Sequence, residues 1–289
     1  MSELLDTFPA FLTYWADVEH KPLDEQIESW AAGYMSQWPE LLAKQIEDYT
    51  GQRLDWRQIA REKVFPHLAE RLSVMQEAHR NLLKVCVPVY SRAQQALGFD
   101  CDAVFVVYVG IGCGAGWVTS FGGSPAILFG LENIAECGWS APVTLNGLVA
   151  HEIGHLAHYH WRAQYGKSIG TGPWWQLYEE GFAQTCESLI LGTEVGHQAS
   201  QGNGEWLAWC QGHKGWLAAE FLNAVDAGQP VTSFFGSWYE ICGQSETGYF
   251  LGQAAIKELG KRLSLKEIAL LENTESSLRP ILEQEWMAK

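Results

Sequence analysis

The sequence lacks the paired cysteine spacing of a disulfide-stabilised protein. Its seven cysteines are an odd number, and no two of them form a C-x-x-C pair. A chain of 289 residues, 47% of them hydrophobic, can bury a core without cross-links, either as one large domain or as a domain with a subdomain. We therefore expect reduced thiols and a reducing compartment.

Basic residues are also scarce. Lys and Arg number 19 against 34 Asp and Glu, so the formal net charge is −15 at pH 7. Such a surface repels nucleic-acid phosphates and anionic lipids, and we expect neither nucleic acid nor membrane as a partner. No apolar run reaches the roughly 18 residues of a membrane span, and the acidic, interrupted N-terminal segment is not a secretory signal. These absences predict a cytoplasmic protein of unknown oligomeric state.

The sequence does contain a helix-rich pattern with a short β-region in its middle. Residues 1–97 have apolar side chains at helical spacing and predict a helical N-terminal subdomain without chemistry of its own. Two apolar runs, 103–109 and 126–131, predict buried strands, and the glycine-rich stretch between them predicts a loop. Further helices are predicted at 140–161, 174–191, 206–221, 248–262, 264–272 and 275–288. This order predicts an α+β fold, mostly helical with a small β-sheet.

The segment His151-Glu152-Ile153-Gly154-His155 is the strongest chemical signal. Ser140, as N-cap, and Pro142, in the first turn, are expected to start the helix that carries it. Positions i and i+4 are neighbours on one helix face, so both imidazoles can bind one metal ion, and neutral imidazole suits Zn²⁺. The intervening Glu152 can reach a water on the metal without binding the metal itself.

A catalytic zinc of this kind takes three protein ligands and leaves a position for water. A histidine six residues after the second ligand is one known arrangement, but Trp161 stands there. A glutamate on a following helix is the other, and the segment 174–188 supplies Glu180. We expect His158, one helical turn beyond His155, to be a packed or solvated side chain rather than a ligand.

These motifs resemble those of the gluzincin, or thermolysin-like, superfamily of zinc metallopeptidases. The segment EEGFAQTCE has the E-G-x-A form of aminopeptidase N and of related, poorly characterised zinc-dependent proteases. In those families the glutamate before the glycine is the metal ligand, which implies Glu180, with Glu179 as the alternative. Glu187, two turns later on the same face, would then hydrogen-bond a ligand histidine. Two features depart from the family: the separation of His155 and Glu180 is longer than usual, and Gln184 replaces an aspartate of thermolysin-like enzymes.

Two more short segments resemble aminopeptidase N. The sequence GLEN at 130–133 is similar to its G-A-M-E-N segment, which implies that Glu132 binds the free amine of a substrate. The Y-x-x-G pattern at 249–252 implies that the hydroxyl of Tyr249 stabilises the transition state, with Tyr239 as the alternative. The resemblance extends over about 126–260, so residues 1–97 contribute nothing to it.

The sequence therefore predicts a zinc-dependent metallopeptidase, a hydrolase with one Zn²⁺ per chain and a peptide or protein as substrate. The catalytic region would be residues 98–289, with Glu152 as general base and His151, His155 and Glu180 as ligands. An aminopeptidase is one form of this prediction, and the choice between exo- and endopeptidase stays open. Two rivals use the same site: a catalytically retired or chaperone-like zinc-binding module, and a zinc hydrolase of a small non-peptide substrate.

Overall fold

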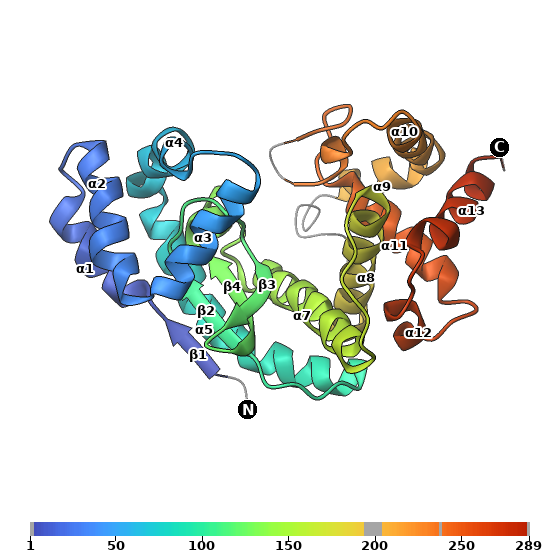
Figure 1. The fold of residues 1–289 in the computed structure, drawn as a ribbon, viewed down its shortest axis with the longest axis horizontal. Helices are drawn as coiled ribbons and strands as arrows, with labels where there is room; N and C mark the ends of the chain where they lie inside the picture. Colours follow the sequence, from blue (N-terminus) through green and yellow to red (C-terminus); the bar gives the residue numbers. More distant parts are fainter. Residues whose placement is uncertain (1–2, 194–203, 237–238, 288–289) are drawn as a thin grey trace. The chain divides into compact units, whose positions relative to one another are not determined.

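The computed structural model describes residues 3–193, 204–236 and 239–287 (Figure 1). The chain divides into two compact units, the first formed by residues 1–89 and 100–149, the second by 90–99 and 150–289. Helices α5 (Leu68–Leu97) and α7 (Pro142–Gln164) each contribute residues to both units. The predicted α+β class is confirmed, because helices predominate and the strands form one small sheet. A domain boundary after residue 97 stays a prediction.

The first unit contains a four-stranded sheet in the order β1-β2-β4-β3. Strands β2 (Val104–Tyr108) and β4 (Ser124–Gly130) lie at its centre, parallel to each other, and bury most of their side chains. They correspond to the two apolar runs of the sequence, since a strand covered on both faces needs apolar residues at successive positions. The two strands predicted from composition are therefore confirmed.

The two edge strands were not predicted. Strand β1 (Glu3–Asp6) pairs in parallel with β2, so the expectation that residues 1–97 are wholly helical is wrong at its start. Strand β3 (Trp117–Phe121) pairs antiparallel with β4 and occupies part of the stretch predicted as a loop. Gly122 and Gly123, both at positive φ, join β3 to β4. A Gly-Gly pair is a recognised turn between hairpin strands, so this signal was present in the sequence.

The remaining elements of the first unit are helical. The apolar periodicity near residues 27–38 corresponds to α2 followed by a π-helical turn and a 3-10 turn, rather than to one helix. The helical elements are α1 (Phe8–Val18), α2 (Leu23–Ser29), η1 (Trp30–Tyr34), η2 (Met35–Gln37), α3 (Pro39–Gly51), α4 (Trp56–Ile59), η3 (Ala60–Val64), η4 (Phe65–His67) and α6 (Leu131–Glu136).

In the second unit, the described residues form helices and connecting loops, with an isolated β-bridge between Ile241 and Gln244. This unit contains α7 from residue 150 onward, α8 (Pro173–Leu191), α9 (Gly204–Gly212), α10 (Lys214–Asp226), η6 (Thr232–Phe234), α11 (Thr247–Leu259), α12 (Leu265–Ala269) and α13 (Thr274–Met287). The predicted helices at 174–191, 248–262 and 264–272 match α8, α11 and α12 within a few residues. The predicted helix at 275–288 matches α13, except that its last residue, 288, lies outside the described range. The single helix predicted over 206–221 is wrong, because α9 and α10 are separate helices divided at His213.

Helix α7 begins at Pro142 as predicted, whereas Ser140 is not its N-cap. The hydroxyl of Ser140 donates to the carboxylate of Glu77 at 3.0 Å instead. Proline is favoured in the first helical turn because its missing N–H would have no partner there.

Two glycines allow α8 and α11 to pack backbone against backbone. A Cβ at Gly181 would lie 2.2 Å from the carbonyl carbon of Gly252, and one at Gly252 would lie 2.3 Å from the carbonyl oxygen of Leu177. Neither position has room for any side chain. This contact sets the register of α11 on α8 and therefore the position of Tyr249, one turn before Gly252.

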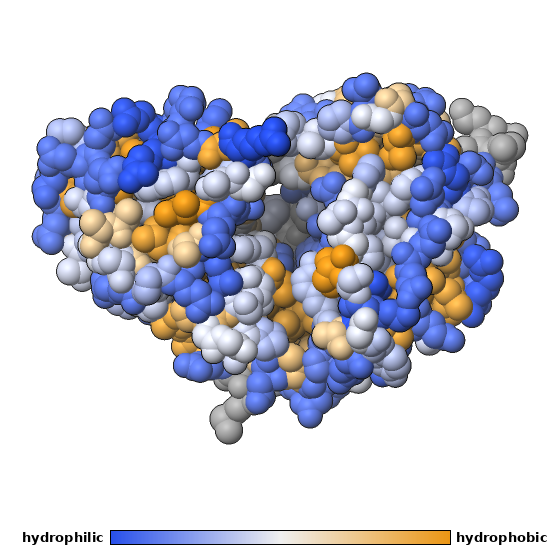
Figure 2. All heavy atoms as spheres, viewed as in Figure 1, coloured by the Kyte–Doolittle hydropathy of each residue, from blue (hydrophilic) through white to orange (hydrophobic). Residues whose placement is uncertain are grey.

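Figure 2 shows a mainly hydrophilic face with apolar residues in small, separate groups, as the acidic composition predicts. Among the described residues, no helix has the length and apolar character needed to cross a bilayer.

We predict that Gly181→Ala destabilises the fold by about 1–3 kcal/mol, because the added methyl group forces α8 and α11 apart. Gly51→Ala is the matched control, since a Cβ at this helical glycine meets no atom within 4 Å in the part of the chain that the structure describes. It should be neutral or stabilising by up to about 1 kcal/mol. Chemical denaturation of both variants measures the difference, and equal stability of the two would contradict the packing role of Gly181.

Candidate metal centre

Helices α7 and α8 bring two imidazoles and one carboxylate together. The Nε2 atoms of His151 and His155 lie 3.2 Å apart, and Glu180 Oε2 lies 3.2 Å from the first and 3.3 Å from the second. Among the described residues these three form the one group of His, Cys, Asp and Glu side chains whose ligand atoms converge in this way. The arrangement is a possible metal site with two nitrogen donors and one oxygen donor.

Gly154, between the two histidines, explains why α8 comes so close. A Cβ there would lie 2.9 Å from both the Cα of Ala183 and the Cβ of Cys186, so glycine alone fits. Because the helices nearly touch at this point, the side chains of Glu180 and Glu187 reach the imidazoles of α7. The helix that carries the motif thus requires its glycine for packing as well as its histidines for chemistry.

The charges around the two imidazoles oppose the effect of burial. Burial by itself lowers the pKa of His151, but hydrogen bonds to Glu180 and Glu187 outweigh it and raise this pKa to about 10. The pKa of His155 is also raised, since the charge of Glu180 outweighs burial. The pKa of Glu180 is held well below its usual range by the two histidines, although burial raises it. The carboxylate charges that raise these two pKa values would also favour a metal cation at this possible site.

Glu187 and Gln184 lie on the Nδ1 side of the His151 imidazole. Glu187 is fully buried, and its Oε2 lies 3.7 Å from Nδ1 of His151. The amide nitrogen of Gln184 donates to the same oxygen at 2.8 Å. Gln184, which departs from the family pattern, therefore contacts the carboxylate that faces the histidine.

Glu179 does not join the group of ligand atoms. The hydroxyl of Tyr159 donates to its Oε1, and this oxygen lies 3.9 Å from Nδ1 of His155. Glu179, the alternative ligand predicted from the sequence, thus lies near the other ring nitrogen of His155 from Glu180.

The two residues expected to act in catalysis have different surroundings. Glu152 is buried on α7, and its charge contributes to the raised pKa of both His151 and His155. The ring centroid of Tyr249 lies 5.7 Å from that of His151 and 5.8 Å from that of Phe235. Tyr239, the alternative to Tyr249, exposes 51% of its surface.

Glu132 belongs to the other compact unit, at the start of α6. Its carboxylate accepts hydrogen bonds from the backbone amides of Gly110 at 2.7 Å and Gly112 at 3.2 Å, and Asn133 accepts one from Gly114. Burial raises the pKa of Glu132 to about 7, although these amides lower it. The GLEN segment therefore holds the glycine-rich loop, and its role as an amine anchor stays a prediction.

His158 is a packed histidine, as expected. It is fully buried and stacks on Trp175 with ring centroids 5.5 Å apart, and the ring centroid of Phe182 lies 4.8 Å from that of the imidazole. The hydroxyl of Tyr178 donates to the carbonyl of Ile268, so the Nε2–H of His158 donates to the tyrosine oxygen at 3.0 Å. Burial, together with the charges of His155 and Arg162, lowers the pKa of His158 to about 3.

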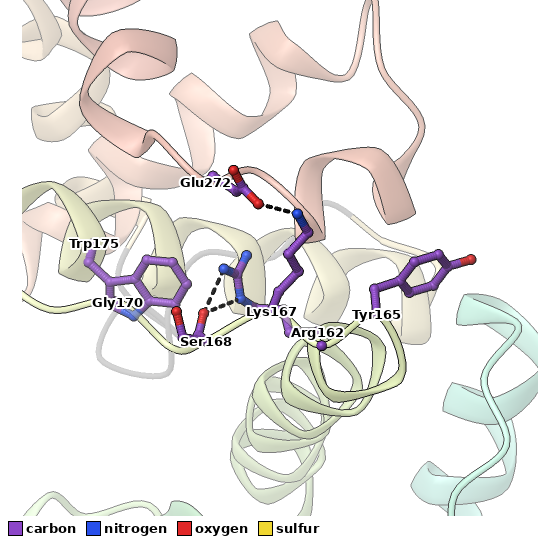
Figure 3. Close-up of a pocket in the computed structure, with 8 residues that line it drawn as sticks. Arg162, Tyr165, Lys167, Ser168, Gly170, Trp175 and Glu272 are labelled. Carbon is purple, nitrogen blue, oxygen red and sulfur yellow. Dashed lines mark hydrogen bonds and ion pairs between the residues drawn. The ribbon is translucent and has the colours of Figure 1, made fainter.

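Arg162 fastens the end of α7 to α12. Its guanidinium donates to the carbonyls of Ala269 and Leu271 at 2.8–2.9 Å. It also donates to the carbonyl of Ser168 at 2.6–2.9 Å and lies over the ring of Trp175 (Figure 3). A polar pocket of about 300 Å³ borders this arginine, and the ion pair of Lys167 with Glu272 lies at its edge. Carbonyls accept four hydrogen bonds from the guanidinium, so Arg162 is a structural clamp. The candidate metal ligands are not among the residues that line this pocket.

Comparison with known proteins finds no match: no family model, no curated protein and no solved structure is similar to this chain. The resemblance to gluzincins therefore rests on the motif residues alone, and membership of that superfamily stays a prediction.

We predict that the His158 imidazole makes the fold acid-sensitive. Its pKa is about 3 in the folded protein against an ordinary value of 6.5, so only the unfolded state binds a proton as the pH falls below 6.5. The metal-free wild type should therefore lose up to about 1.4 kcal/mol per pH unit relative to His158→Phe between these values. Denaturant titrations at pH 7.5, 6 and 5 measure the free energy of unfolding.

His20→Phe is the control, because the side chain of His20 is 91% exposed. It should follow the wild type at every pH. A His158→Phe variant that also follows the wild type would show that the buried imidazole is protonated in the fold.

Proposed function

We propose that this chain is a zinc-dependent metallopeptidase whose metal is held by His151, His155 and Glu180. The convergence of their three ligand atoms beside Glu152 carries the proposal. Glu180 precedes the glycine of an E-G-x-A segment, and Tyr249 lies beside a ligand histidine. These features support hydrolysis of a peptide or protein substrate.

The spacing of the ligand atoms supports zinc. Two atoms bound about 2.0–2.1 Å from a tetrahedrally coordinated ion lie about 3.3–3.4 Å from each other. The separations among His151, His155 and Glu180 are 3.2–3.3 Å. Two imidazoles and one carboxylate are also a known donor set of catalytic zinc, with a fourth position left for water.

In the proposed mechanism the side chains of this protein transfer one proton and stabilise the negative charge that develops on the carbonyl oxygen. Zinc supplies Lewis acidity and lowers the pKa of water. Glu152 accepts a proton from the water as the water oxygen attacks the scissile carbonyl carbon. It then transfers that proton to the nitrogen of the scissile peptide bond as the C–N bond breaks. The hydroxyl of Tyr249 donates to the carbonyl oxygen, on which negative charge develops. Glu187 orients His151.

We predict that the purified protein takes up one zinc ion per chain and that His151→Ala abolishes this uptake. Removal of an imidazole leaves two ligands, too few to hold the ion against a chelator. His20→Ala is the matched control, because His20 is exposed and lies at none of the ligand positions. Elemental analysis after dialysis gives the stoichiometry. Full zinc content in His151→Ala would refute the metal centre.

We predict that Glu152→Gln keeps its zinc and its thermal stability but hydrolyses peptide substrates roughly 100- to 10,000-fold more slowly. The amide retains the shape of the side chain and cannot accept the proton of water. A mixed peptide library analysed by mass spectrometry identifies cleaved sequences, and the best of these gives the rates. Normal turnover by Glu152→Gln would rule out its role as base, and no cleavage by the zinc-loaded wild type would rule out the peptidase.

A further inference from the structure

The two ring nitrogens of His155 have different surroundings. Nε2 lies 3.3 Å from Glu180 in the group of ligand atoms. Nδ1 points away from that group and is buried, with no hydrogen-bond partner within 3.5 Å among the described residues. A buried N–H without an acceptor is costly, so an acceptor near Nδ1 affects both the stability and the orientation of the ring.

Glu179 is the carboxylate beside this nitrogen. Its Oε1 lies 3.9 Å from Nδ1 of His155, about 1 Å beyond a normal hydrogen bond. The side chain is only 15% exposed, so solvent competes weakly for this oxygen. A small rotation of either side chain therefore completes the contact.

Tyr159 holds the carboxylate in this place. Its hydroxyl donates to the same Oε1, and its ring centroid lies 6.2 Å from that of His155. Tyr159 and His155 are four residues apart on α7, so they share one helix face. The tyrosine thus fixes the position of an α8 carboxylate relative to an α7 histidine.

We propose that Tyr159 and Glu179 are a positioning pair for His155. Glu179 accepts the Nδ1–H, which leaves the lone pair of Nε2 for the metal, and Tyr159 holds Glu179 in register. This inference rests on the metal-binding part of the proposed function and is independent of the substrate.

At His151 too, a carboxylate faces Nδ1 and accepts a hydrogen bond from a neutral side chain, although the residues differ. There Glu187 faces Nδ1 at 3.7 Å, and the amide of Gln184 donates to that carboxylate. Each ligand histidine therefore has a carboxylate of α8 behind it, and each carboxylate accepts a hydrogen bond from a neutral donor.

The test measures zinc affinity by competition with a chromogenic chelator in the full-length protein. Glu179→Leu removes the acceptor and should weaken zinc binding about 10- to 100-fold. Glu179→Gln keeps a carbonyl oxygen, and Tyr159→Phe keeps the carboxylate, so each should weaken binding only a few-fold. Tyr159→Phe in the Glu179→Leu background should cause no further loss, because the tyrosine acts through the carboxylate.

Tyr178→Phe is the control for a merely structural effect. It also removes a buried tyrosine hydroxyl, but one that contacts His158 and the carbonyl of Ile268. It should lower the melting temperature and leave zinc affinity unchanged. A second readout is the imidazole ¹⁵N spectrum of the zinc-loaded protein, in which the Nδ1–H of His155 should exchange with solvent faster in Glu179→Leu than in the wild type.

The outcomes separate this inference from the proposed function. A wild type that binds no zinc overturns both. A wild type that binds zinc, with the Glu179 and Tyr159 variants equal to it in affinity and in proton exchange, overturns the positioning pair alone. An additive loss in the double variant overturns the action of Tyr159 through Glu179.

Discussion

The close approach of α8 to its two neighbours is the constraint on which the candidate metal centre depends. Glycine at position 154 lets α7 touch the backbone of α8, and Gly181 and Gly252 let α11 do the same from another side. A methyl group at any of these three positions would meet backbone or Cβ atoms at 2.2–2.9 Å. Carboxylates of α8 and a tyrosine of α11 reach the imidazoles because the helices lie so close together.

This packing brings several negatively charged carboxylates together in a buried site. Four carboxylates, Glu152, Glu179, Glu180 and Glu187, surround the imidazoles of α7, and each is largely buried. Buried acids without a counter-ion are unstable, and without a metal the raised pKa of His151 lets a proton serve as the cation. A divalent ion offers more charge in the same space. These charges are therefore compatible with a cation at the possible metal site formed by His151, His155 and Glu180.

The glycine-rich region shows how a local pattern can mislead. Alternating glycines at 110–116 suggested a loop, and the backbone amides of Gly110, Gly112 and Gly114 in that stretch donate to Glu132 and Asn133. The pattern hid β3, whose residues Trp117–Phe121 have strand propensity and end at a Gly-Gly turn. Strand β1 gave a weaker signal, because four residues carry little periodicity and their partner β2 is about 100 residues away.

By itself, the sequence determined the features that depend on neighbours along the chain. The spacing of His151 and His155 places both on one helix face. Pro142 begins α7, and Gly192 caps the C-terminal end of α8. Only the tertiary structure decided which of two adjacent glutamates joins them. Residues 179 and 180 point about 100° apart on α8, so the face of α8 that meets α7 determines the outcome. That face is set by the packing at Gly154, Gly181 and Gly252, between segments far apart in the sequence, and helical periodicity contains no information about it.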